Sequence, residues 1–402
     1  MHDLKADSGS AKGSRSRLFL PALAAASFSS GPITVLAALL LVDIGNTFNT
    51  TVGVASQINT AYAIAAVVFA LLTSLLSVKF EHKSLLLAGV LLMTVSVLGC
   101  YFAQGFTVLL VFYSISGAGY AIVNPMAFAL IGDQLHLEKR AGAIGWVVAG
   151  GALVYVVGAP IIAFMSGFGG WRFPLSAFVL PVLLISLLIC FVGLPSASRN
   201  RDISADTATS SNFKEILQNK SALACLIGDT LRSAAFVAIV LYATSFFRQK
   251  FLLSTGNASL VLLGGASFYV FGSLSAGKFI SKLGRKSSTA LTALLSGAFT
   301  ISYVLASNIW ISMALMLVAS WFFGMVASSA NSLTLEQSPK HRGTMMSIDT
   351  ALINAGSAIG STIGGLALLY LNYEGLGSVL GAVGIVAAVV FFLLTRDPTT
   401  KP

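Results

Sequence analysis

Apolar runs long enough to cross a bilayer recur along the whole chain and limit its fold more than any other feature. A transmembrane helix needs about 20 apolar residues, and backbone groups in lipid must be paired within the protein, which leaves helices for such runs. The sequence therefore predicts an all-α membrane protein with twelve transmembrane helices, at 18–42, 53–77, 85–104, 107–131, 141–165, 173–194, 221–246, 257–280, 288–306, 309–334, 344–370 and 376–394.

The composition excludes an ordinary soluble enzyme. Of the 402 residues, 56% are hydrophobic and 9% are charged, whereas soluble domains carry about 25% charged residues. The polar stretches 1–17 and 195–220 are too short for a catalytic domain, and no P-loop is present. The three cysteines, Cys100, Cys190 and Cys225, lie in apolar runs, so neither a disulfide framework nor a metal site is indicated. We expect no enzyme activity, no metal and no cofactor.

The first span has two interpretations. Arg15 and Arg17 precede a short apolar stretch followed by small residues, as in a cleavable signal peptide. The apolar run resumes through Ile33 to Val42, which favours an uncleaved first span.

The basic residues predict the orientation. With the N-terminus in the cytoplasm, most of the 24 lysines and arginines fall in cytoplasmic segments, and Arg172, Arg248 and Lys250 fall outside. The net charge of +10 is then a topology signal and does not indicate nucleic-acid binding. We expect a multi-pass protein of the cell membrane with both termini cytoplasmic.

The chain contains an internal repeat. A shift of about 200 residues superposes Ser74–Lys83 on Gly277–Lys286, and both segments lie in predicted cytoplasmic loops. Two six-helix pseudo-repeats follow. The predicted divisions are a cytoplasmic N-terminal tail (1–17), an N-terminal bundle (18–194), a cytoplasmic central loop (195–220), a C-terminal bundle (221–394) and a cytoplasmic C-terminal tail (395–402).

Several motifs resemble the major facilitator superfamily over residues 18–394. The segment Gly277-x-x-x-Ser281-Lys282-x-Gly284-Arg285-Lys286 is similar to that family's loop signature, and its first-half copy is eroded. Gly158-Ala-Pro160 in span 5 resembles the export branch of drug/proton antiporters and arabinose-efflux-like permeases, while Tyr113 stands where many proton-coupled members have arginine.

This resemblance implies a major facilitator fold and a secondary active transporter that exports small organic or drug-like molecules by alternating access. It also implies proton-coupled antiport by a monomer in a lipid bilayer. A metabolite symporter or uniporter remains an alternative. A transport-inactive membrane receptor or scaffold, which needs no hydrated cavity, is an alternative of another class.

Two charged residues lie near the middle of span 7. Asp229 and Arg232 are three residues apart and share a helix face, and ionisable groups at this depth are costly and usually functional. They are the candidates for proton coupling, and a structural ion pair is the competing interpretation. Asp349 lies about one turn into span 11, where a helix-start or latch role is expected.

Two further groups of residues follow from the fold that the resemblance implies. Side chains at mid-depth would line a cavity for an amphipathic substrate: Ser30, Thr34, Tyr120, Asn124, Tyr269, Trp321 and Asn354. Residues of the loop signature and nearby acids would form a cytoplasmic gate: Gly277, Lys282, Gly284, Arg285, Glu336 and Asp133, the last facing His82 or Lys83.

Overall fold

The computed structural model describes most of the membrane part of the chain. The described residues are 18–135, 143, 146–147, 150–151, 153–195, 215–216, 218–338 and 342–398. The predicted N-terminal tail, most of the predicted central loop and residues 399–402 lie outside them.

The N-terminal half, residues 18–195, is built of helices throughout the described residues. Gly31 and Pro32 separate the first two, because proline at the first helical position starts a new helix. The elements are α1 (Phe19–Ser29), α2 (Pro32–Thr47), α3 (Val52–Ala55), α4 (Gln57–Lys79), α5 (His82–Phe102), α6 (Phe106–Gln134), η1 (Val154–Gly158), α8 (Ala159–Gly169), η2 (Gly170–Arg172), η3 (Leu175–Val179) and α9 (Leu180–Gly193).

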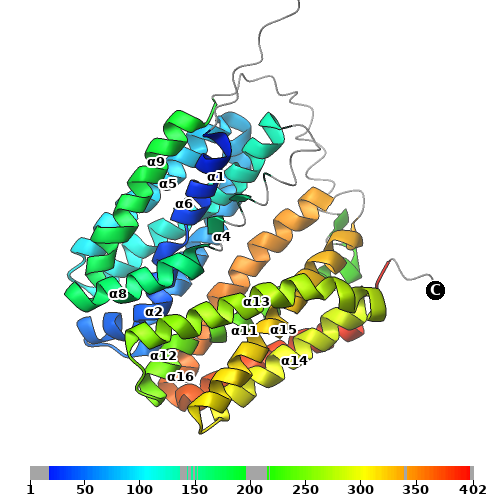
Figure 1. Ribbon diagram of the computed structural model, residues 1–402. Coiled ribbons are helices and arrows are strands. Elements are labelled where there is room, and N and C mark those ends of the chain that lie inside the picture. Colours follow the sequence, from blue (N-terminus) through cyan, green and yellow to red (C-terminus); the bar gives the residue numbers. More distant parts are fainter. Residues whose placement is uncertain are drawn as a thin grey trace, which may run out of the picture.

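The C-terminal half, residues 218–398, is also helical where it is described (Figure 1). The side chains of Asn219, Ser254 and Asn308 cap helix N-termini by accepting hydrogen bonds from backbone N–H groups. The elements are α11 (Lys220–Val240), α12 (Ala243–Lys250), α13 (Thr255–Leu283), α14 (Arg285–Leu305), α15 (Ile309–Gln337) and α16 (Arg342–Leu394). The all-α prediction is confirmed for the described residues.

Eleven helical segments among the described residues are long and apolar enough to span a bilayer, and α16 accounts for the difference from twelve. Its 53 residues would extend about 80 Å as one rod, but Asn372 breaks the helix with φ 59° and ψ −168°. A Cβ added at Gly360 would lie 2.3 Å from the Ala234 carbonyl, and one at Gly384 would lie 3.3 Å from the Ala235 Cβ. Residues before and after Asn372 thus pack against neighbouring residues of α11, so α16 crosses the membrane twice.

The even number of crossings brings the ends of both halves together. Leu18 contacts the position of Gly193, and the backbone N–H of Arg396 donates to the Ser221 hydroxyl over 2.8 Å. We call this side of the bundle the terminal end. The opposite side, where α2 meets α12 at the lower left of Figure 1, is called the Asp43 end.

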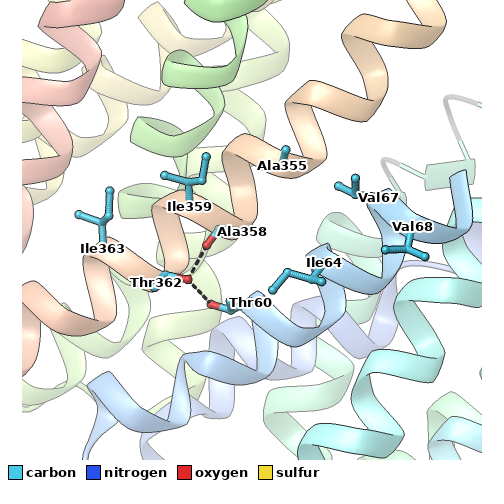
Figure 2. Close-up of a pocket in the computed structure, with 9 residues that line it drawn as sticks. All are labelled: Thr60, Ile64, Val67, Val68, Ala355, Ala358, Ile359, Thr362 and Ile363. Atoms are coloured by element: carbon cyan, nitrogen blue, oxygen red, sulfur yellow. Dashed lines mark hydrogen bonds between the residues drawn. The ribbon is translucent and has the colours of Figure 1, made fainter. Parts of the chain in front are cut away.

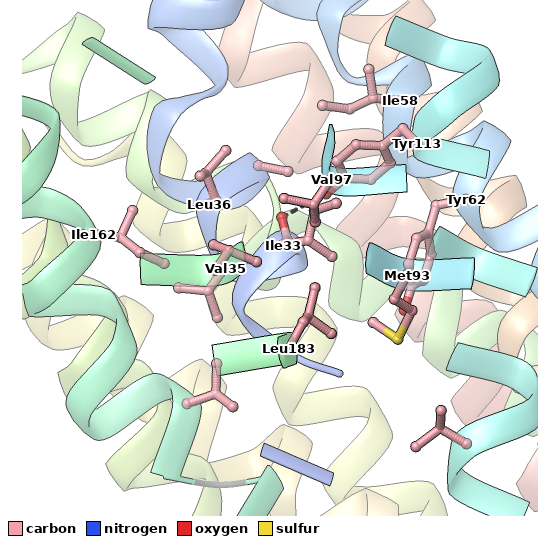
Figure 3. Packing of buried hydrophobic residues seen from close by; sticks show 14 of the residues in the cluster. Ile33, Val35, Leu36, Ile58, Tyr62, Met93, Val97, Tyr113, Ile162 and Leu183 are labelled. Carbon is pink, nitrogen blue, oxygen red and sulfur yellow. Dashed lines mark hydrogen bonds between the residues drawn. The ribbon is translucent and has the colours of Figure 1, made fainter. Parts of the chain in front are cut away.

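Packing inside the bundle depends on small residues, and the outer surface is apolar. A Cβ at Gly117 would lie 2.0 Å from the Tyr62 carbonyl, so α4 and α6 approach backbone to backbone. Figure 3 shows the aliphatic and aromatic side chains that fill the N-terminal half. Outward-facing Phe164, Leu188 and Leu274 are 70%, 65% and 76% exposed, which suits contact with lipid.

Candidate functional site

An ion pair joins the two halves at the Asp43 end. The Arg248 guanidinium of α12 donates to both carboxylate oxygens of Asp43 on α2, over 2.5 and 3.1 Å. It also donates to the Leu39 carbonyl over 3.1 Å. Nearby, the Thr244 hydroxyl donates to the Ala38 carbonyl. These contacts join the two halves directly at the Asp43 end.

A second contact between the halves lies where α4 crosses α16. The Thr60 hydroxyl is 2.8 Å from the Ser361 hydroxyl and 3.1 Å from the Thr362 hydroxyl. Further along the crossing, a Cβ at Gly365 would lie 2.6 Å from the Gly53 carbonyl, so only glycine permits this approach.

A cleft of about 420 Å³ begins at this crossing and continues toward the terminal end between α4 and α16 (Figure 2). The threonine hydroxyls provide its polar atoms, and the other lining side chains are aliphatic. The lining residues are Thr60, Ile64, Val67, Val68, Ala355, Ala358, Ile359, Thr362 and Ile363. Such a surface suits an apolar or amphipathic molecule.

Tyrosines from both halves gather in the bundle interior. The rings of Tyr62 and Tyr120 are 5.8 Å apart, and those of Tyr62 and Tyr113 are 5.9 Å apart. The Tyr113 hydroxyl donates to the Ile33 carbonyl over 2.7 Å (Figure 3). Tyr155, in the π-helical turn η1, lies within electrostatic range of both Tyr120 and Tyr269. Tyr155 therefore lies near predicted cavity residues of both halves.

The buried charged pair lies next to this group in the C-terminal half. The Arg232 Nε donates to Asp229 Oδ1 over 2.7 Å, and the Thr334 hydroxyl donates to Asp229 Oδ2 over 3.2 Å. Both charged residues are buried, and Tyr269 lies within electrostatic range of both. The Tyr269 ring stacks on Phe236 with 5.1 Å between centroids.

Asp349 lies closer to this pair than the sequence indicated. Helix α16 begins at Arg342, so Asp349 is two turns inside the helix instead of one. The residue is completely buried, and neither carboxylate oxygen has a hydrogen-bond partner among the described residues. Its charged neighbours are Asp229 and Arg232.

The other predicted cavity residues take different places. The hydroxyls of Ser30 and Thr34 each donate to the backbone carbonyl three residues earlier in the chain. Gly31 lies between these two residues, and a Cβ there would lie 2.8 Å from the side chain of Val154, which precedes Tyr155. In the part of the chain described, the buried Asn124 Nδ2 has no hydrogen-bond partner. Asn354 donates to the Thr350 carbonyl one turn earlier in α16, whereas the Trp321 indole of α15 donates to the Ser275 hydroxyl of α13.

The predicted cytoplasmic gate residues lie at the terminal end. Gly284 adopts φ 78° in the turn between α13 and α14, which explains the glycine of the loop signature. The backbone N–H of Arg285 donates to Asp397 over 3.1 Å, and its Nε donates to Ser332 over 2.9 Å. Glu336 is half-buried in the last turn of α15.

Three more of these residues complete the terminal end. Asp133 is 2.6 Å from His82 Nδ1, the first of the two partners expected for it. Lys282 is exposed in the last turn of α13, and a Cβ at Gly277 would meet no atom within 4 Å.

Sequence reasoning missed several residues of this region, namely Asp43, Tyr62, Tyr155, Phe236 and Asp397. Asp43 had a detectable signal, because it is an acid at the end of a long apolar run and the predicted outer loops contain Arg248. Tyr155 had none, because an aromatic residue in a membrane helix is indistinguishable from a lipid-facing one before the helices are packed.

Comparisons with known proteins point to the same family as the sequence motifs. A sequence profile described as Major Facilitator Superfamily matches residues 22–267 and 233–402. The chain is similar to two Bacillus subtilis (strain 168) proteins, the uncharacterized MFS-type transporters YceJ and YwfA. YceJ is 23% identical over 89% of this chain and 90% of its own length. YwfA is 22% identical over 90% of this chain and 88% of its own length.

Solved structures share the fold at low sequence identity. A D-xylose-proton symporter superposes with a TM-score of 0.81 at 14% identity, over 96% of this chain and 99% of that one. A bacterial homolog of the human lysosomal transporter Spinster, solved in an inward-facing and unoccupied conformation, gives 0.79 at 16% identity over 96% and 98%.

Proposed function

The chain belongs to the major facilitator superfamily and is a multi-pass membrane transporter of small molecules, not an enzyme; we propose that it exports amphipathic organic or drug-like molecules by alternating access, in exchange for protons. The observation that carries this proposal is the apolar cleft between α4 and α16, which lies between two halves that are tied together at the Asp43 end.

The orientation of the proposed transport follows from charge. Lys79, Lys83, Lys220, Lys278 and Lys282 all lie at the terminal end. The positive-inside rule then makes this end cytoplasmic and makes the Asp43 end external. We propose that the structure, joined at the external end, represents an inward-facing state of a cell-membrane protein.

This orientation can be tested by labelling. Gln249 is exposed at the Asp43 end and Lys278 at the terminal end, and each is replaced by cysteine in a separate variant. In intact cells a membrane-impermeant maleimide should label the first and not the second. The reverse pattern would overturn the orientation.

The chemistry of the interior favours an amphipathic substrate over a sugar. A sugar needs many hydrogen-bond partners, because each buried hydroxyl without one costs about 1–3 kcal/mol. The cleft supplies threonine hydroxyls and aliphatic surface, and Tyr120, Tyr155 and Tyr269 add aromatic faces with single polar groups. This combination suits a molecule with a ring system and few polar atoms.

Proton exchange is the proposed driving force because charged groups are buried in the middle of the C-terminal half. Asp229 and Arg232 are both buried, and such residues in membrane proteins usually mark ion pathways. A guanidinium next to a carboxylate stabilises its ionised form. We propose that the pair changes partners during the cycle, so that a carboxyl of this cluster binds a proton in one state and releases it in the other. One monomer contains all of these groups.

The proposed function can be tested with purified protein in lipid vesicles and an imposed pH gradient. The probes are ethidium and chloramphenicol, with D-xylose and uridine as polar counter-probes. We expect uphill movement of an amphipathic probe against proton flow, lost in Asp229→Asn and kept in Glu374→Gln, which changes an exposed acid. Transport of D-xylose or uridine alone would favour the metabolite symporter.

A binding measurement tests the alternative that the protein is a receptor or scaffold. A ligand of the folded state raises its apparent melting temperature. A protein that is stabilised by the probes but moves none of them in vesicles would be a receptor or scaffold.

A further inference from the structure

Asp349 is the buried charged residue whose surroundings least explain its presence. Its side chain is 0% exposed on α16, in the membrane part of the chain. Neither oxygen accepts a hydrogen bond from any described residue. A carboxylate in this position is shielded from solvent and has no donor among the described residues, which is among the most costly arrangements for a charge.

The groups that face Asp349 come from α11, with contributions from α13 and α15 around the same cluster. From α11 they are Cys225, Asp229 and Arg232. Tyr269 of α13 lies within range of Arg232 and Asp229, and Thr334 of α15 donates to Asp229. Arg232 is therefore the cation that the described residues supply to two carboxyl groups.

The geometry decides which carboxyl Arg232 neutralises in this state. Its Nε is 2.7 Å from Asp229, whose second oxygen is satisfied by Thr334. With Asp229 paired in this way, an ionised Asp349 would give the cluster a net charge of −1. Binding one proton to Asp349 brings the cluster to zero. The protonated carboxyl then has an O–H to donate toward the neighbouring Asp229.

The position of Asp349 on α16 connects its charge to the movement of the halves. Within about three turns after Asp349, the same helix lines the cleft at Ala355 and Ile359. It then contacts the N-terminal half through Ser361 and Thr362. A change in charge at Asp349 alters how α16 packs on α11, and α16 transmits this change to the cleft and to the contact between the halves.

We propose that Asp349 is the carboxyl that binds and releases the coupled proton, while Asp229 remains the partner of Arg232 in the inward-facing state. This inference rests on the proposed proton exchange and names its carrier. The proton comes from water on one side of the membrane, forms an O–H bond with one Asp349 oxygen, and leaves to water on the other side after the halves have rearranged.

The test detects the proton directly and needs no substrate. Infrared difference spectra between neutral and alkaline pH are recorded for purified full-length protein in phosphatidylcholine vesicles, in H2O and in deuterium oxide. A protonated carboxylic acid gives a C=O stretching band that shifts in deuterium oxide. At neutral pH we expect such a band in the wild type, its loss in Asp349→Asn and its retention in Glu374→Gln, the exposed control.

Asp229→Asn separates this assignment from its rival. Removing the Asp229 charge frees Arg232 to pair with Asp349, so the band at neutral pH should disappear in this variant too. A band that survives in Asp349→Asn and is lost in Asp229→Asn would make Asp229 the proton carrier and overturn the proposal. A band that survives in both variants would overturn it as well.

Folding controls and the link to transport are kept separate. Each variant is first checked for a single species by gel filtration. If Asp349→Asn does not fold, Asp349→Glu should keep the band with a changed frequency and titration midpoint, and an unchanged spectrum contradicts the proposal. If the protein shows the band but transports none of the vesicle probes, the inference about Asp349 stands and the proposed function is wrong.

Discussion

Removing Asp43 should open the external end of the protein. In Asp43→Ala, Arg248 loses two charge-assisted hydrogen bonds to the other half and keeps the one to Leu39. Hydrogen bonds to charged groups contribute about 1.5–3 kcal/mol when buried, and exposed ion pairs contribute about 0.2–1 kcal/mol. The Arg248 side chain is 12% exposed and that of Asp43 is 35% exposed, so an intermediate loss of about 2 kcal/mol is expected.

This loss applies to the closed state alone, because the pair bridges halves that separate when the external end opens. A change of about 2 kcal/mol corresponds to about a 30-fold fall in the ratio of closed to open molecules. Spin labels at Asn46→Cys on α2 and Gln249→Cys on α12, both exposed, report this ratio by pulsed electron double resonance. The population at long distance should grow in Asp43→Ala.

A matched control lies at the same end of the molecule. Lys250 and Glu374 also form an ion pair, with 3.5 Å between charged atoms, but both belong to the C-terminal half. Glu374→Gln should leave the label distances unchanged. Equal distance distributions in wild type and Asp43→Ala would refute the assignment of Asp43 and Arg248 as the external closure, as would an equal opening in the control.

Two further predictions concern packing and the cleft. Gly360→Ala should lower the free energy of unfolding by about 1–3 kcal/mol, because its Cβ would lie 2.3 Å from the Ala234 carbonyl; Gly277→Ala, with open space at its Cβ, should leave thermal melting unchanged. Ile359→Trp should obstruct the cleft and slow ethidium transport, while Val95→Trp, at a lipid-facing site on α5, should transport at the wild-type rate; equal slowing in both would remove the cleft from the pathway.

The family and the number of crossings were predictable because they depend on local composition. Apolar length alone located the spans, and the loop signature at Gly277–Lys286 pointed to the family that the comparisons show. The reversal at Asn372 lies within the predicted gap between the last two spans, 344–370 and 376–394. One residue with positive φ turns the chain there, and no glycine or proline marks the turn at that position.

The candidate site was predictable only where a residue is unusual on its own. Asp229 and Arg232 could be selected from the sequence because charges in membrane spans are rare. The environment of Asp349 could not, because it depends on α16 starting at Arg342 and running parallel to α11. Contacts between distant segments, such as Asp43 with Arg248, follow from the docking of the halves, which no local pattern encodes.

The central claim is that the two ends of the molecule open alternately. Its most direct test places one label pair at each end of the same protein: Asn46→Cys with Gln249→Cys at the Asp43 end, and Glu81→Cys with Lys278→Cys at the terminal end, all exposed positions. Distances are measured with and without Asp43→Ala. Alternating access predicts that this change lengthens the first distance and shortens the second in equal fractions of molecules. If both distances lengthen together, or if the first changes while the second stays fixed, the two ends are not coupled and the account is wrong.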